Sequence, residues 1–86
     1  MRYEISDEPG GPTLVLRDQL TFADRDPFDG VIDKLLARRA RRVAIDLTQL
    51  DYMDSAGLGM LLTLRDRAER ADTEVVLRNP RSEVRE

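Results

Sequence analysis

The chain has 86 residues and a formal net charge of -3, and it contains neither cysteine nor histidine. This length corresponds to one small domain. The composition excludes disulfides and removes the usual ligands of transition metals, so that only a carboxylate site for a hard cation would remain. Arginines are interspersed with acidic residues, which argues against a nucleic-acid binder, because such proteins carry a basic stripe.

The sequence carries no sign of membrane targeting. Its first residues, Met1 to Glu4, lack the apolar core of a signal peptide. The longest apolar segment, Gly57 to Leu64, is far too short to span a bilayer. We therefore expect a cytoplasmic protein without membrane insertion.

The N-terminal third predicts a β-hairpin. Tyr3 and Ile5 alternate with polar residues, which is the period of a half-buried strand, and the apolar run in 13–17 predicts a second one. Pro9-Gly-Gly-Pro12 between them forces a turn, so the two strands are expected to pair antiparallel.

Asp26 and Pro27 predict the start of a helix, because an acid accepts hydrogen bonds from free amides and proline tolerates the first turn. The helix is expected to run to about Arg39, and the arginines that follow are interpreted as its solvated end. Its apolar face, at helical spacing, consists of Phe28, Val31, Ile32, Leu35 and Leu36.

The second half predicts a strand, a helix and a strand. Residues 43–47 alternate as in a strand, 48–52 form a short connection, and 74–78 form a further strand. The helix between them is expected to bury Leu58, Leu61, Leu62, Leu64 and Ala68. The final residues, 79–86, resemble a turn and a helix start capped by Asn79 or Ser82.

This order of elements predicts an α/β fold with a small mixed β-sheet, in which strand-helix-strand units pair in parallel and the helices pack to cover the sheet. We expect residues 1–86 to form a single domain.

Ser55 lies where the second predicted helix begins after a strand, within the segment Asp51-Tyr-Met-Asp-Ser-Ala-Gly-Leu-Gly-Met-Leu61. Two roles are open to Ser55 there. Its oxygen is placed to cap the helix, and its hydroxyl is placed to be modified, since a phosphoryl group would meet the free backbone amides. Gly57 and Gly59 each cost up to about 1 kcal/mol relative to alanine in a helix, which suggests a reason beyond packing.

An enzyme is disfavoured by the same residues. A serine nucleophile needs a base, no histidine exists, and Lys34, the only lysine, lies within the first predicted helix. Neither a Gly-x-Ser-x-Gly elbow nor a phosphate-binding Gly-Lys-Ser/Thr is present. Asp46, Asp51 and Asp54 could converge at the end of one strand, but turn and cap roles are preferred. We expect no catalytic residues, no metal and no cofactor.

The segment from Val43 to Leu61, with its Asp-Ser-Ala-Gly-Leu-Gly block, closely resembles the STAS domain, the sulfate transporter and anti-sigma factor antagonist family. The run Val75-Val-Leu-Arg-Asn-Pro80 fits the family's next strand and turn. The resemblance implies a regulatory domain that binds an anti-sigma factor with serine kinase activity. That partner would use ATP to phosphorylate Ser55, and the phosphorylated domain would release the partner.

The resemblance also implies a contact surface around Ser55. It would comprise Asp54, Ala56, Gly57, Leu58 and Gly59, together with residues that follow the second strand. Many family members have an aspartate after the second strand. In this chain Thr21 occupies that position, in the run Asp18-Gln19-Leu20-Thr21, and Asp24 is the nearby acid that would replace it.

The family continues into a last amphipathic helix, which is missing before the end at Glu86. We therefore expect a domain truncated at its C-terminus that self-associates through the uncovered face or is less stable than an extended chain. An alternative function stays open: a STAS scaffold subunit of a stress-signalling or lipid-transport complex, without a phosphorylation switch and with Ser55 only as a cap.

Overall fold

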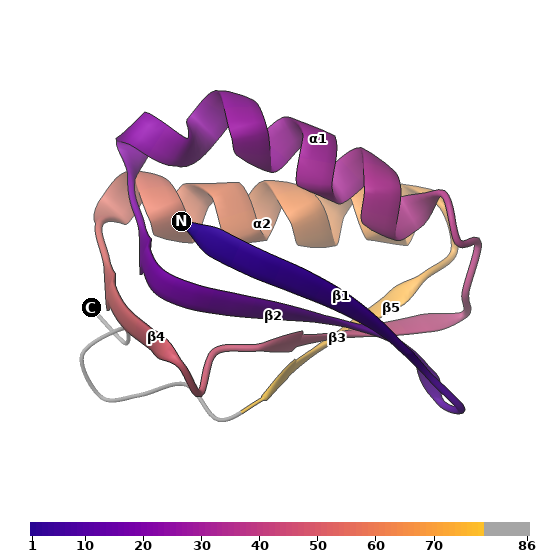
Figure 1. Ribbon diagram of the computed structural model, residues 1–86. Helices are drawn as coiled ribbons and strands as arrows, with labels where there is room; N and C mark the ends of the chain where they lie inside the picture. The colour runs from indigo at the N-terminus through magenta and orange to yellow at the C-terminus, as the bar shows by residue number, and fades with distance from the viewer. Residues whose placement is uncertain (79–86) are drawn as a thin grey trace.

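The computed structural model describes residues 1–78, and it places both α-helices on one face of a mixed sheet (Figure 1). The elements in chain order are β1 (Arg2–Glu8), β2 (Gly11–Leu20), the 3-10 helix η1 (Phe22–Asp24), α1 (Arg25–Leu36), β3 (Arg42–Asp46), β4 (Leu50–Met53), α2 (Ser55–Arg70) and β5 (Glu74–Arg78). The predicted α/β class is confirmed.

The first two strands form the predicted antiparallel hairpin, with Ser6 opposite Thr13 and Glu8 opposite Gly11. Gly11 has a φ of 126°, and a Cβ atom there would lie 2.1 Å from the carbonyl oxygen of Arg42. Glycine is therefore required where the hairpin passes β3. The second strand is longer than predicted and extends to Leu20.

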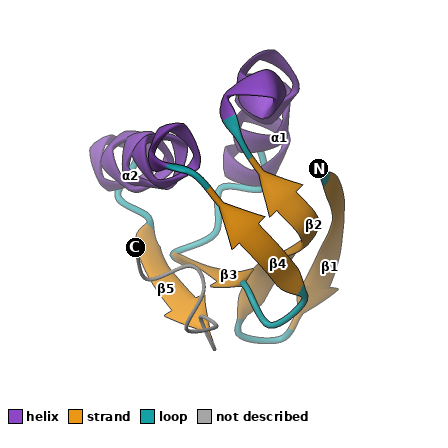
Figure 2. Cartoon of the chain, turned by 90° about the vertical axis from the view of Figure 1, so that its left-hand side faces the viewer, coloured by secondary structure: helices purple, strands orange, loops and turns teal. Residues whose placement is uncertain are grey.

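The strand order is β1-β2-β3-β5, and the pairs β2–β3 and β3–β5 are parallel. The strand-helix-strand prediction is therefore confirmed for both units. Figure 2 looks along the helices and shows β5 beneath α2.

The prediction that residues 48–52 only connect two elements was wrong, because Leu50–Met53 form β4. This strand pairs in parallel with the far end of β2, through Asp18–Leu20, after a register shift at Asp18. Asp18 has a φ of 71°, so β2 changes partner from β3 to β4 at a local irregularity. Four residues without strict alternation carry too weak a signal for a strand.

The first helix begins earlier than predicted. Asp24 occupies the N-cap position, because η1 leads directly into α1, and Pro27 is the third helical residue. A proline is tolerated there since the first amides of a helix lack partners within it. The helix ends at Leu36 rather than at Arg39. Of the predicted inward residues, Phe28, Val31, Ile32 and Leu35 are buried and Leu36 is half-buried.

The second helix turns a different face to the sheet from the predicted one. Leu61, Leu64 and Ala68 are buried as expected, but Leu58 and Leu62 are 37% and 47% exposed. The sheet-facing positions at the start of α2 are taken by Gly57 and Met60. The close contact of Gly57 with the end of β2 fixes this rotation, and it leaves Leu58 and Leu62 at the flank of the helix.

The core lies between the helices and the sheet. Its fully buried side chains include Leu14, Leu16, Leu20, Phe28, Ile32, Leu35, Ile45, Leu47, Leu50 and Leu64. In the part of the chain that the structure describes, neither α-helix is long and apolar enough to cross a bilayer. The turn and helix start predicted at 79–86 lie outside the described residues.

The two glycines of α2 provide a matched test of this packing. A Cβ atom on Gly57 would lie 2.2 Å from the Leu20 carbonyl oxygen, whereas one on Gly59 meets nothing within 4 Å. We expect Gly57→Ala to lower the free energy of unfolding by about 1–3 kcal/mol through overpacking. Gly59→Ala should raise it by up to about 1 kcal/mol through helix propensity. Urea denaturation measures both, and equal effects of the two substitutions would contradict the contact.

Candidate functional site

The start of α2 is capped by Asp54 and not by Ser55. The Asp54 Oδ1 atom accepts a hydrogen bond of 2.8 Å from the Gly57 amide, and Ser55 is the first helical residue. The hypothesis that Ser55 is the N-cap was therefore wrong. Ser55 is exposed, and among residues 1–78 its hydroxyl makes no hydrogen bond. Its side chain is thus accessible at the positive end of a helix dipole.

Asp54 also joins the helix to the segment that follows β2. Its second carboxylate oxygen, Oδ2, accepts a hydrogen bond of 3.2 Å from the Phe22 amide. The Asp54 amide donates to the carbonyl oxygen of Leu20 at 3.3 Å. One residue therefore fixes both the helix start and the adjacent η1 helix.

Thr21 and Asp24, both predicted to contact a partner, bind each other in the structure. The Asp24 carboxylate accepts a 2.9 Å hydrogen bond from the Thr21 amide, and its other oxygen lies 3.0 Å from the Met1 ammonium. Burial by itself would raise the pKa of Asp24, but the hydrogen bonds from Thr21 and the ammonium group outweigh it and hold the pKa below its ordinary value of 3.8. Asp24 thus stabilises the η1 segment beside the site.

A groove of about 420 Å³ runs between the starts of α1 and α2, next to Ser55. Ala56 and Gly59 line it from α2, and Phe22 and Arg25 line it from the facing segment, together with Phe28, Asp29, Ile32, Met60 and Thr63. Phe22 is 62% exposed, and the Arg25 guanidinium lies 5.0 Å from the centroid of its ring. Of the predicted contact residues, the groove contains Ala56 and Gly59.

Phe22 and Arg25 are not among the residues predicted to form the site. The sequence does contain a signal for Phe22, because an aromatic residue in a polar stretch directly after a strand is a candidate for an exposed contact residue. Their place beside Ser55 depends on the hydrogen bond that Phe22 donates to Asp54, a residue far along the chain.

The predicted contact residues Gly57 and Leu58 do not line this groove. Gly57 is buried against Leu20, and Leu58 lines a different hollow of about 190 Å³ with Leu62, Val75 and Leu77. The surface predicted around Ser55 therefore has two sides, one along α1 and one toward β5.

Two of the carboxylates that were considered as a converging group, Asp46 and Asp54, have separate structural roles. The Asp46 side chain accepts a 2.9 Å hydrogen bond from the Thr48 amide. Burial would raise the pKa of Asp46, but the hydrogen bonds from Thr48 and the nearby positive charges of Arg78 and Arg17 lower it overall. Within residues 1–78, no three potential ligands gather as a metal site.

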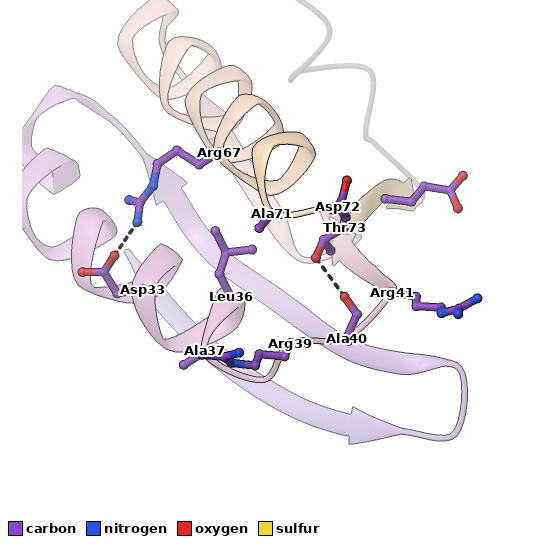
Figure 3. A pocket seen from close by; sticks show the side chains of 11 residues that line it. Asp33, Leu36, Ala37, Arg39, Ala40, Arg41, Arg67, Ala71, Asp72 and Thr73 are labelled. Atoms are coloured by element: carbon purple, nitrogen blue, oxygen red, sulfur yellow. Dashed lines mark hydrogen bonds and ion pairs between the residues drawn. The ribbon is translucent and has the colours of Figure 1, made fainter.

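A further hollow of about 940 Å³ lies at the other end of the helices, where α1 and α2 terminate (Figure 3). Arg67 pairs there with Asp33 at 2.5 Å, and the Thr73 hydroxyl donates to the Ala40 carbonyl oxygen at 2.8 Å. These contacts hold the two helix ends together. The hollow is remote from Ser55, which begins α2.

The fold and the site define a small α/β domain in which an exposed serine opens the helix that follows β4. A family model described as "Mlab, STAS domain" matches residues 3–86. A STAS-domain containing protein of Pseudomonas aeruginosa (strain UCBPP-PA14) is 34% identical over 73 residues, which cover 85% of this chain and 71% of that protein. The chain therefore belongs to the STAS domain family.

Solved structures show the same fold. An anti-sigma factor antagonist from Mycobacterium paratuberculosis superposes with a TM-score of 0.77 at 18% identity, over 94% of this chain and 70% of that one. The anti-sigma factor antagonist SpoIIAA in its unphosphorylated form gives 0.74 at 17% identity, over 93% and 74%. A protein called Mglu gives 0.75 at 18%, and this chain spans only 20% of its length.

The hydrogen bonds of Asp24 predict a specific dependence of stability on pH. A carboxylate whose pKa is lowered by folding stabilises the protein above its unfolded pKa, and this contribution is lost as the pH falls below about 4. We expect Asp24→Asn to lower the melting temperature at pH 7 and to make its fall between about pH 5 and pH 3 shallower than in the wild type. Thermal denaturation followed by circular dichroism measures this. Parallel curves for the two proteins would show that Asp24 makes no such contribution.

Proposed function

We propose that this domain is an anti-sigma factor antagonist-like regulatory protein of the cytoplasm, and not an enzyme. It binds a partner anti-sigma factor that is also a serine kinase, and phosphorylation of Ser55 by that partner with ATP ends the interaction. Unmodified, the domain occupies the partner and thereby frees the sigma factor.

The observation that carries this proposal is the free hydroxyl of Ser55 beside an occupied cap. Because Asp54 accepts the bond from Gly57, Ser55 has no structural task that would explain a hydroxyl at this position. A serine at the exposed first position of a helix is accessible to the active site of a kinase. In that step the serine oxygen forms a bond to the γ-phosphorus of ATP, ADP leaves, and the serine proton passes to a base of the partner.

The charge around Ser55 explains how modification would weaken the complex. A phosphoryl group adds about -1.5 to -2 charges at neutral pH. It would stand next to the Asp54 carboxylate, whose two oxygens already accept bonds from Gly57 and Phe22. Like-charge repulsion and desolvation at a protein interface then oppose binding, and each loss of about 1.4 kcal/mol lowers the affinity tenfold.

The groove beside Ser55 supplies a contact surface for the partner. Gly59 leaves α2 open at this point, since a Cβ atom there would meet nothing. Phe22 presents an exposed ring and Arg25 a charge on the facing side. An aromatic residue and an arginine are the types that contribute most to binding at protein interfaces.

A scaffold subunit without a switch is the second candidate. It is favoured by the use of Asp24, a predicted contact residue, as an internal hydrogen-bond acceptor beside Thr21. In such a protein, assembly with partner chains would not depend on a charge at Ser55.

The charge at position 55 distinguishes the two candidates. We expect Ser55→Ala to bind the anti-sigma kinase as the wild type does and to abolish phosphoryl addition, measured by intact mass and peptide mapping after incubation with ATP. Ser55→Asp should weaken binding by about tenfold or more, because it places a negative charge beside Asp54.

Ser55→Asn is the matched control, since it has nearly the shape of the aspartate and no charge. Calorimetric titration of the kinase with both variants separates charge from size. Equal affinities of the Asp and Asn variants would contradict the electrostatic switch and favour the scaffold. Phosphoryl addition to Ser55→Ala at the wild-type level would show that the acceptor is another residue.

A further inference from the structure

The outer edge of β5 is a backbone surface without a partner in the described part of the chain. Within residues 1–78, β5 pairs only with β3, and the strand order ends there. In Figure 2 it lies beneath α2, at the side of the sheet away from β1. An unpaired edge of this kind offers hydrogen bonds to another strand.

The backbone groups that face this edge belong to Val75 and Leu77. The Glu74 amide donates to Arg41, and the Arg78 carbonyl oxygen accepts from Leu47, so residues 74 and 78 point toward β3. Successive residues of a strand direct their amides and carbonyls to opposite edges, and residue 76 therefore also points inward. The amides and carbonyls of Val75 and Leu77 point outward.

The sequence of β5, Glu74-Val-Val-Leu-Arg78, is complementary to itself in an antiparallel pair. If a second copy pairs antiparallel about Val76, Val75 of each copy lies opposite Leu77 of the other. These two residues then exchange backbone hydrogen bonds through the amides and carbonyls that point outward. In the same register Glu74 of each copy lies opposite Arg78 of the other. Opposite charges at facing positions stabilise a strand pair.

The side chains above this edge are mostly apolar, and apart from the half-buried Val75 the apolar ones at the surface are exposed. Val75 and Leu77 line one hollow with Leu58 and Leu62 of α2, and Leu77 is 54% exposed. A two-fold axis through Val76 keeps both α2 helices on the same side of the joined sheet. The exposed leucines of the two copies then face each other across the axis.

The present partners of the two charges do not prevent this pairing. Glu74 lies 3.0 Å from Arg42, and Arg78 lies 3.8 Å from Glu8, and all four side chains are between 42% and 62% exposed. Exposed ion pairs contribute little to stability, so Glu74 and Arg78 are available to a second copy.

We infer that the chain forms a two-fold dimer by antiparallel pairing of β5 with β5 of a second copy, in the register that places Glu74 opposite Arg78. The dimer joins the two sheets into one and covers Leu58, Leu62 and Leu77. This inference does not depend on phosphorylation of Ser55.

Charge reversal tests the register. Glu74→Arg places two facing pairs of like positive charges in the dimer, and Arg78→Glu places two pairs of like negative charges. We expect each variant alone to dimerise about tenfold more weakly than the wild type or worse. A mixture of the two variants makes both facing pairs attractive again and should form the mixed dimer. Sedimentation velocity of wild type, single variants and mixture, from about 1 μM to about 1 mM, measures this.

Two further variants control for local damage. The double variant Glu74→Arg, Arg78→Glu loses the same contacts to Arg42 and Glu8 as the single variants, yet it should dimerise like the wild type. Leu77→Pro removes an amide that points outward and none that β3 uses, so it should abolish the dimer while circular dichroism shows a folded chain.

A wild-type chain that stays monomeric over this range would overturn the inference. If it became dimeric only after removal of residues 79–86, the edge would belong to that segment. A dimer that persists unchanged in both single variants would place the interface elsewhere, and it would likewise overturn the inference.

Discussion

The arrangement of the site depends on the carboxylate of Asp54. One of its oxygens accepts from the Gly57 amide and the other from the Phe22 amide, which lies more than thirty residues earlier in the chain. A carboxylate satisfies amides at a helix start better than a hydroxyl does, because its bonds are charge-assisted and it is stabilised by the helix dipole. With the cap position occupied by Asp54, the Ser55 side chain is left exposed at the helix surface.

The close packing of α2 on the end of β2 is the second constraint on the site. Gly57 lies against the Leu20 carbonyl oxygen, and this contact sets the rotation of the helix. The rotation buries Met60, Leu61 and Leu64, and it turns Gly59 toward the groove and Leu58 toward β5. Two glycines in one helical turn therefore have different roles: Gly57 allows the packing, and Gly59 keeps one side of the groove open.

The exposed surface of α2 has two different sides in consequence. The side along α1 combines an aromatic ring, a guanidinium and open backbone next to Ser55, and it suits a protein partner. The side toward β5 is mostly apolar and continues into the edge of that strand. In an antiparallel pair of two copies, Glu74 of one strand would face Arg78 of the other. The proposed binding of a partner and the proposed pairing of two copies thus use separate parts of one small domain.

The sequence by itself determined the hairpin, both α-helices and strands β3 and β5, because each depends on a local pattern. Alternation, helical spacing, Pro-Gly turns and the Asp-Ser-Ala-Gly-Leu-Gly block are all readable within a few residues. Four features depended on tertiary structure: β4, the cap by Asp54, the outward position of Leu58 and Leu62, and the groove formed with Phe22 and Arg25. They share one physical reason. Each is fixed by contact with a segment distant in the chain, chiefly the end of β2 and the η1 helix after it, and local patterns carry no information about such contacts.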